Sequence, residues 1–569
     1  MPLKVIICGN YRNFCSNYSC ISRTPSRLNK GLCFRKKMYE IYSNKECLFV
    51  SFLTTKNTIT MKKFIFSPIL IIISILSGCS FDHKDNSDGE KTILTLPTEN
   101  CDCCGTLFEH NSIHYKIITS NSVEIIQNTL HESITDNIVI PDTISYQGST
   151  YKVVSIGSRA FEDCFNIKCF KIPSTITNIG DRAFWGCSAL TSITIPDSVI
   201  NIGEFAFYNC KSLKFVILPN CIKSIGKFAF MDTKWYNELP QGPIYINDIL
   251  YDYKGKIPAD MSLVIKEGTT HICEAALYGQ SSLTTLNLPY SVKSIGLHAF
   301  NDTKWYYSQP DGAIYVNNIL YDYKGKMPAY KTKFVVKEGT ISICGGAFST
   351  CESLKTITIP KSVADIGQFP FSSCTSLTKI QVKNGNPIYD SRNKCNAIIH
   401  TATNTLVAGC KNTIIPNTVT SIGEYAFASI FHLNSIIIPE GVTSIGAYAF
   451  IHCSSLSFVK LPKTLVCIGQ GTFSFCESLK SIVVPNNVTS IEEYAFNYCT
   501  SLESISIPNS VNYIGPEAFR QCLSLKSIYY DGNISDWKKL NVDNIPFLCK
   551  VHCNDGTLGS IEYIMQKYQ

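Results

Sequence analysis

The residues most able to do chemistry in this 569-residue chain are its 27 cysteines and ten histidines. Cys101, Cys103 and Cys104 form a thiol cluster of the kind that binds zinc, but no Cys or His follows at finger-like spacing. Cys549 and Cys553 flank His552, an arrangement that a pair of terminal strands explains more simply. We therefore predict no metal site, and we interpret the first cluster as a local disulfide or as unpaired thiols in a linker.

The sequence lacks the common motifs of catalytic sites. The sequence holds no HExxH, GxSxG, phosphate-binding loop or GxGxxG in a fitting context, and no pair of carboxylates can be placed together by spacing. The histidines are scattered, which is typical of solvated side chains on a surface. The sequence therefore predicts a protein that is not an enzyme and needs no cofactor.

Nine further cysteines recur in a regular pattern, each three residues after a phenylalanine. Stacked repeats would bring some of them within disulfide range, but parallel side chains disfavour a bridge between every pair. A free cysteine is also a good small core residue. We predict buried thiols at Cys164, Cys187, Cys210, Cys351, Cys374, Cys453, Cys476, Cys499 and Cys522.

The last four of these cysteines belong to a 23-residue phrase that occurs five times between Ser421 and Ser535. One copy, which begins at Cys467, reads CIGQGTFSFCESLKSIVVPNNVT. A fixed period of this length indicates a solenoid, in which each repeat is one coil stacked on its neighbours. A single coil cannot bury both of its flat sides, so the coils must stack to be stable.

Each position in the phrase has a structural interpretation. The LxxIxI segment alternates like a short half-buried strand, and the proline after it ends that strand. The VTSIG segment is a second short strand, whose glycine would permit a turn with positive φ. The Ala-Phe pair points into the coil, so we predict a stacked spine of Phe427, Phe450, Phe473, Phe496 and Phe519.

The pattern LxxIxIPxxVTxIGxxAFxxCxS resembles the BspA-type leucine-rich repeat of bacterial cell-surface proteins. The resemblance covers most of residues 150–535 and implies a leucine-rich-repeat solenoid. It also implies a role in adhesion to host or microbial surfaces.

The predicted solenoid spans residues 156–528 and holds about sixteen coils, because Phe161 to Phe519 keep the register across three longer gaps. The gaps predict β-hairpin inserts on one flank, near residues 232–269, 302–339 and 384–416. The first two inserts are copies, and we interpret them as the only places where Trp and Tyr cluster outside the core positions of the repeat. We expect β caps at 107–155 and 529–569.

The duplicated inserts carry the candidate ligand-binding residues. Aromatic side chains of this kind often anchor protein interfaces, although they would also serve to pack small inserts onto the coils. The candidates are Trp235, Tyr236, Tyr251, Tyr253, Trp305, Tyr306, Tyr321 and Tyr323.

The N-terminal region predicts export. Lys62 and Lys63 precede a 13-residue apolar run that suits a signal peptide over residues 61–78, and Leu76–Cys79 resembles a lipobox whose cysteine is lipidated. We interpret Met61 as the true start and residues 1–60 as an upstream mistranslation, with a genuine basic leader as the alternative. Residues 79–106 form an acidic polar tether.

The net charge of the chain bears on which classes of partner it could bind. Residues 1–60 hold ten basic and two acidic side chains, and from Cys79 onward 39 basic side chains face 42 acidic ones. The basic balance that would suggest nucleic acid therefore disappears. We predict an exported, outer-membrane lipoprotein at the cell surface that contacts the membrane only through its lipid. It would bind an extracellular protein or glycan, or else serve as a structural or glycan-capture lipoprotein of a nutrient-uptake system. A periplasm-facing orientation stays open.

Anchorage can be tested at Cys79. Replacing it (Cys79→Ala) should abolish membrane association, because the thiol is the lipid attachment point. Metabolic palmitate labelling measures this directly, and label that persists in the variant would contradict the assignment.

Overall fold

The computed structural model describes residues 38–43, 46–55 and 58–63 as strands, and residues 107–127, 136–259, 261–540, 542, 545–546 and 548–559 in detail. The chain divides into two units, residues 1–76 and 77–569. In the first unit, β1 (Met38–Ser43), β2 (Glu46–Thr55) and β3 (Thr58–Lys63) form an antiparallel sheet. Cys79 and the thiol cluster at 101–104 lie outside the described residues.

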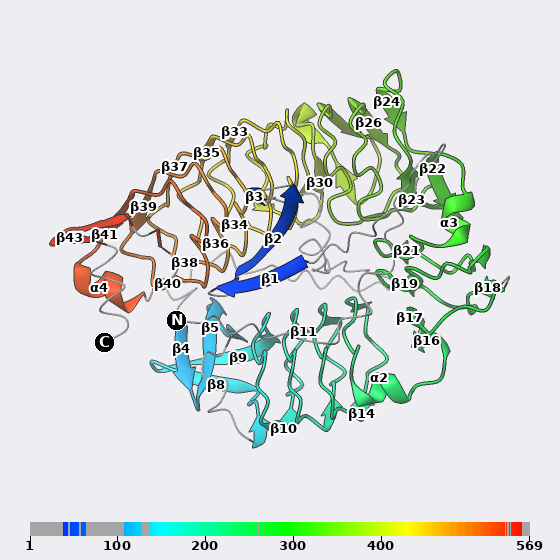
Figure 1. The fold of residues 1–569 in the computed structure, drawn as a ribbon, viewed down its shortest axis with the longest axis horizontal. Coiled ribbons are helices and arrows are strands. Elements are labelled where there is room, and N and C mark those ends of the chain that lie inside the picture. The colour runs from blue at the N-terminus through cyan, green and yellow to red at the C-terminus, as the bar shows by residue number, and fades with distance from the viewer. Residues whose placement is uncertain are drawn as a thin grey trace. The chain divides into compact units, whose positions relative to one another are not determined.

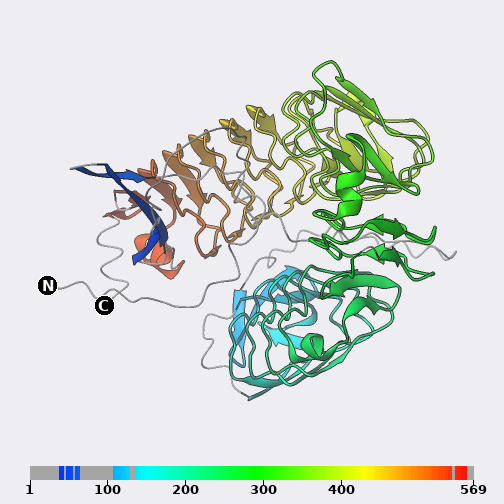
Figure 2. The same cartoon turned by 45° about the vertical axis from the view of Figure 1, so that its right-hand side comes forward.

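The second unit is a β-solenoid of about 17 turns with little helix, which confirms the predicted fold (Figure 1). A regular coil contributes one longer and one shorter strand, and within uninterrupted runs both pair in parallel with the same strand of the next coil, 23 residues on. In Figure 1, β33, β35 and β37 lie along one edge of the stack and β34, β36 and β38 along the other. Figure 2 shows the yellow to orange coils as successive stacked loops.

The longer strands arise from the LxxIxI segments and form what we term the long-strand ladder. Its members are β7 (Asp136–Val139), β10 (Ile167–Lys171), β12 (Ser192–Thr194), β14 (Phe215–Ile217), β18 (Ser262–Val264), β20 (Thr285–Asn287), β24 (Lys333–Val335), β26 (Thr356–Ile359), β28 (Lys379–Val382), β33 (Ser435–Ile437), β35 (Phe458–Lys460), β37 (Ser481–Val483), β39 (Ser504–Pro508) and β41 (Ser527–Asp531).

The two-residue strands arise from the VTSIG segments and form the short-strand ladder. Its members are β11 (Asn178–Ile179), β13 (Asn201–Ile202), β15 (Ser224–Ile225), β19 (His271–Ile272), β21 (Ser294–Ile295), β25 (Ser342–Ile343), β27 (Asp365–Ile366), β32 (Ser421–Ile422), β34 (Ser444–Ile445), β36 (Cys467–Ile468), β38 (Ser490–Ile491) and β40 (Tyr513–Ile514).

The phenylalanine spine forms as predicted. The rings are fully buried, and neighbouring rings in the regular coils stack nearly parallel with centroids 4.9–5.8 Å apart. In most coils the cysteine thiol donates to the carbonyl of the spine phenylalanine one coil earlier. Cys476 Sγ, for example, lies 3.3 Å from Phe450 O, and Cys499 Sγ lies 3.1 Å from Phe473 O.

The reason we gave for the repeated glycine is wrong. Gly203, Gly226, Gly446 and Gly515 do not adopt positive φ. A Cβ at Gly226 would instead meet the backbone N of Glu204, one coil earlier, at 2.3 Å. The glycine is therefore required by the close approach of two coils, and most left-handed positions of the coils are held by other residues, such as Phe205 and Tyr448.

The first two inserts differ from the hairpins that we predicted. Each begins with a short helix, α2 (Lys234–Glu238) or α3 (Lys304–Ser308), capped by the side chain of Thr233 or Thr303. The hairpins follow as β16 (Gly242–Ile246) with β17 (Ile249–Lys254), and β22 (Gly312–Val316) with β23 (Ile319–Lys324). The second strand of each hairpin also pairs in parallel with the short-strand ladder, so the hairpin belongs to the stack and is not laid on its flank.

Two further sets of strands complete the unit. At the start lie β4 (Leu107–His110), β5 (Ile113–Thr119), β6 (Ser122–Ile125), β8 (Thr143–Tyr146) and β9 (Ser149–Ile156), and at the end α4 (Ile534–Lys539), β42 (Lys550–Cys553) and β43 (Gly556–Gly559). The Lys116 ammonium pairs with the Glu492 carboxylate, and Arg159 pairs with Glu493. These contacts join the first elements of the unit to the coil that holds β38.

The spine can be tested at Phe473, whose ring lies between Phe450 and Phe496. Phe473→Ala should lower the free energy of unfolding by about 3–5 kcal/mol, since it leaves a cavity in a close-packed stack. Neighbour contacts dominate a solenoid, so hydrogen exchange should rise in residues 444–519 before residues 157–230. A uniform loss of protection would contradict the one-dimensional stack.

Candidate binding surface

The eight aromatic residues predicted to bind ligand lie in the first two inserts, where they make matching contacts. Tyr236, Tyr251, Tyr253, Tyr321 and Tyr323 are buried, and the other three rings are half-buried. The Tyr251 hydroxyl accepts the Phe230 N–H at 3.0 Å, and the Tyr321 hydroxyl accepts the Phe300 N–H at 2.9 Å. In regular coils that N–H donates to a backbone carbonyl of the next coil, so the two hydroxyls replace a backbone partner that the insert lacks.

The remaining rings of the set pack around these hydroxyls. Trp235 meets Phe230 edge-on at 5.2 Å, and Trp305 meets Phe300 in the same way. Tyr236 donates its hydroxyl to Asp252 at 2.5 Å, and Tyr306 donates to Asp322. The contacts of these eight aromatic residues pack the inserts onto the coils, which is the alternative role that the sequence left open. Ligand binding through these residues stays a prediction.

A second aromatic cluster, in regular coils, shows that the inserts are not the only place where aromatic residues gather. Trp185 lies 4.7 Å from Tyr208 and 5.3 Å from Phe205, and Phe205 lies 5.5 Å from Phe228. The Arg182 guanidinium lies over the Trp185 ring at 4.8 Å. Sequence reasoning missed this cluster because its members occupy variable positions of three successive repeats.

The long-strand ladder carries a set of exposed apolar side chains. Its strands alternate between buried and outward positions, and many of the outward residues are Ser, Thr, Lys or Asn. At some outward positions an apolar side chain stands instead, 50–69% exposed: Phe215, Ile217, Val264, Val335, Ile437, Phe458, Val483 and Tyr529. The signal was readable in the sequence, because these residues replace polar ones at the x positions of LxxIxI.

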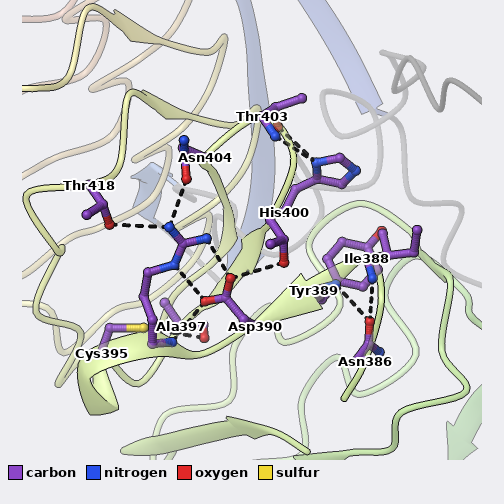
Figure 3. A network of polar contacts seen from close by, with 12 residues as sticks. Asn386, Ile388, Tyr389, Asp390, Cys395, Ala397, His400, Thr403, Asn404 and Thr418 are labelled. Atoms are coloured by element: carbon purple, nitrogen blue, oxygen red, sulfur yellow. Dashed lines mark hydrogen bonds and ion pairs between the residues drawn. The ribbon is translucent and has the colours of Figure 1, made fainter. Parts of the chain in front are cut away.

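The third insert holds β29 (Tyr389–Asp390), the 3-10 turn η1 (Arg392–Lys394), β30 (Ile398–His400) and β31 (Thr405–Ala408), with β30 and β31 pairing as the predicted hairpin. A polar network fixes its shape (Figure 3). Arg392 binds both oxygens of the Asp390 carboxylate, at 2.8 and 2.5 Å, and donates to Asn404 Oδ1 at 2.8 Å. Burial opposes ionisation of Asp390, but the hydrogen bonds from Arg392 hold its pKa below the ordinary value.

This insert opens a cleft in the long-strand ladder. The Thr413 N–H donates to Cys410 O at 3.0 Å, and its hydroxyl donates to Asn396 O at 2.8 Å. The Asn396 side chain in turn donates to Asn412 O at 3.1 Å. Residues 410–414 are therefore held toward the insert, and β33 pairs only with β35 among the described strands.

The resulting cleft has a volume of about 530 Å3. It is lined by Lys411, Asn412, His432, Asn434 and Ser435, without a carboxylate among them. The first two interruptions of the ladder are different, because a helix joins the stack there: Trp235 N–H donates to Leu213 O and Trp305 N–H to Leu283 O, both at 2.7 Å.

The described residues hold no group of three or more His, Cys, Asp or Glu side chains placed to bind a metal ion. His552 stacks on Tyr529 at 5.0 Å, and Cys549 is buried. Burial raises the pKa of ladder thiols such as Cys522, to about 12, which leaves them poor nucleophiles at neutral pH.

Comparison with known proteins decides the family. Residues 146–252, 245–309, 328–405 and 420–541 match the BspA-type leucine-rich-repeat region, in six copies. The chain belongs to the BspA-type leucine-rich-repeat family. Family membership indicates a repeat-based binding or surface role, in a family that is generally non-catalytic and whose surface proteins typically bind extracellular ligands.

The chain is similar to several solved structures of bacterial proteins. A leucine-rich cell surface protein of Faecalibacterium prausnitzii is 26% identical in sequence, and its TM-score is 0.32. The alignment covers 76% of this BspA-type chain and 97% of the Faecalibacterium chain. The pneumococcal vaccine antigen PcpA is 19% identical, with 81% and 95% covered and a TM-score of 0.33. A leucine-rich repeat protein of Bacteroides ovatus is 24% identical, with 78% and 99% covered and a TM-score of 0.22.

No curated protein matches the sequence. None of the helices in the described part of the chain is both long enough and apolar enough to cross a membrane.

The flank of the C-terminal coils makes a pH dependence testable. His452 is buried and stacks on Phe475 at 4.3 Å, and Phe475 stacks on Tyr498 at 4.7 Å. Burial lowers the pKa of His452 to about 4, while an unfolded histidine titrates near 6.5. Between these values the unfolded chain binds more protons, so stability should fall as the pH falls.

The expected loss is about 3 kcal/mol between pH 6.5 and 4, measured by urea unfolding against the variant His452→Phe. The variant should lack this part of the pH dependence. A control, His432→Gln, removes an exposed histidine and should retain it. Identical pH profiles for the parent protein and His452→Phe would show that the imidazole is not held neutral.

Proposed function

We propose that this BspA-type protein is a non-catalytic adhesin of the cell surface, which binds a protein on host or neighbouring cells through the long-strand ladder. The observation that carries the proposal is the set of apolar side chains at outward positions of that ladder. Apolar side chains that gather on one face of a soluble protein mark interaction surfaces. A solenoid holds such a face rigid over many coils, so little conformational entropy is lost on binding.

The anchorage that we propose follows from the N-terminal residues. The apolar run before Cys79 supports export, and the acidic tether after it supports an outward-facing lipoprotein of the outer membrane. A tether of this composition would let the solenoid stand away from the membrane. Glycan capture is the second candidate function, and the polar cleft beside β33 favours it.

The adhesion proposal predicts the effect of removing three outward apolar side chains far from the cleft. The triple variant Phe215→Ser, Val264→Ser and Val335→Ser should weaken attachment to immobilised collagen, laminin or fibronectin at least tenfold. Burying each of these side chains contributes roughly 1.5–3 kcal/mol. Surface plasmon resonance on the purified protein measures the change.

The matched control is Tyr290→Ser with Tyr330→Ser, which removes two side chains that are 84% and 87% exposed but lie outside the ladder strands. Circular dichroism confirms that both variants fold. Equal attachment by the triple variant and the control would remove the ladder face as the binding surface.

A further inference from the structure

The cleft between residues 410–414 and β33 has the chemistry of a ligand site. Its five lining side chains all carry hydrogen-bond donors, and the only fixed charge among them is the ammonium of Lys411. That ammonium spends one donor on Thr375 O, at 3.1 Å, which holds it in place and leaves two for a ligand. A lining of this kind favours an acceptor-rich, negatively charged ligand.

The backbone of β33 adds donors to the same cleft. In the regular coils, the first residue of a longer strand donates to the coil before it, as Phe215 N–H does to Thr191 O at 3.3 Å. By the same geometry the N–H of Ser435 faces residues 411–412, whose backbone has turned toward the third insert. The insert network therefore creates the site, because it diverts the backbone that would otherwise close it.

An exposed aromatic ring lies beside these donors. Phe458 occupies the position next to Ser435 in the following coil, and about half of its surface is exposed. An aromatic face can pack against the C–H face of a pyranose ring while polar neighbours bind the hydroxyl groups. The volume of the cleft suits one or two sugar rings.

We propose that this cleft binds an acidic saccharide, with Lys411 pairing the carboxylate, Asn412, Asn434, His432 and Ser435 binding hydroxyl groups, and Phe458 packing against the ring. The inference rests on the proposed binding function and names the class of ligand for one site. A peptide strand added to the edge of β33 is disfavoured, because residues 411–412 wall the cleft on its other side.

The test is isothermal titration of the full-length protein with three probes: sialyl-lactose, digalacturonic acid and neutral lactose. The two acidic probes distinguish a sialic acid from a uronic acid as the source of the carboxylate. We expect binding of at least one acidic probe and much weaker binding of lactose. No binding of either acidic probe, or equal binding of lactose, would overturn the proposal.

Variants locate the site. Lys411→Gln should weaken binding of the acidic probe about tenfold, as expected for a lost charge-assisted hydrogen bond, and should leave the binding of lactose unchanged. Phe458→Ala should weaken binding of the same probe severalfold. The matched controls are Lys379→Gln, an exposed lysine on β28, and Tyr290→Ala, and neither should change the affinity.

Lys411 also donates a hydrogen bond to Thr375 O, so Lys411→Gln could weaken binding by disturbing the fold. A second variant therefore changes the charge of the cleft without removing that hydrogen bond. Asn434→Asp alters an exposed side chain and should repel an acidic probe. Unchanged affinity in folded Asn434→Asp and Phe458→Ala would place the saccharide elsewhere. The adhesion test changes three residues outside this cleft. If the protein attaches to the immobilised matrix proteins but binds no acidic saccharide, the saccharide site is rejected and the adhesion proposal is not.

Discussion

The close approach of successive coils is the constraint on which the rest of the structure depends. The spine rings stack at 4.9–5.8 Å, and both strands of a coil pair with those of the next. At this spacing a Cβ on Gly226 would collide with the backbone of the coil before it, and a thiol at Cys476 is small enough to reach the carbonyl of Phe450. Glycine, alanine, phenylalanine and cysteine therefore recur for one reason: each fits the space between stacked coils, which bury together the apolar sides that a single coil would expose.

The same constraint explains why the inserts are built as they are. An insert can leave the stack only if the backbone groups of the preceding coil find other partners, since a buried N–H without one is costly. In the first two inserts tyrosine hydroxyls supply that partner, to Phe230 and Phe300. In the third insert, residues 410–414 turn toward the insert itself, through hydrogen bonds from Thr413 to Cys410 O and Asn396 O, and one side of β33 stays open. A surface cleft is the result of that second arrangement.

The sequence predicts much of this fold and little of its binding surface. The period of 23 residues, the spine and the two short strands per coil follow from apolar spacing, which neighbouring coils reinforce. The helix α2 was missed because Thr233 caps a segment of only five residues, too short for any periodic signal. The roles of Tyr251 and Tyr321 were missed because spacing shows where a ring stands but not which N–H lacks a partner. The cleft depends on hydrogen bonds of Asn396 and Thr413 across the insert, and no local pattern encodes such contacts.

Departures from the repeat are therefore the most informative positions of the chain. A residue that obeys the pattern serves the stack, whereas one that breaks it must be explained by a contact outside its own coil. Glu492 shows the principle, because it stands where other coils have the glycine and its carboxylate pairs with Lys116, 376 residues away. Burial opposes the charge on Lys116, but Glu492 raises the pKa of the ammonium above its ordinary value, so both groups stay ionised at neutral pH. Removing one partner would leave a buried charge without compensation, so this pair fixes the contact between distant coils more than it stabilises either coil. The apolar residues at outward ladder positions break the pattern in the same sense, and the binding face that we propose would account for them.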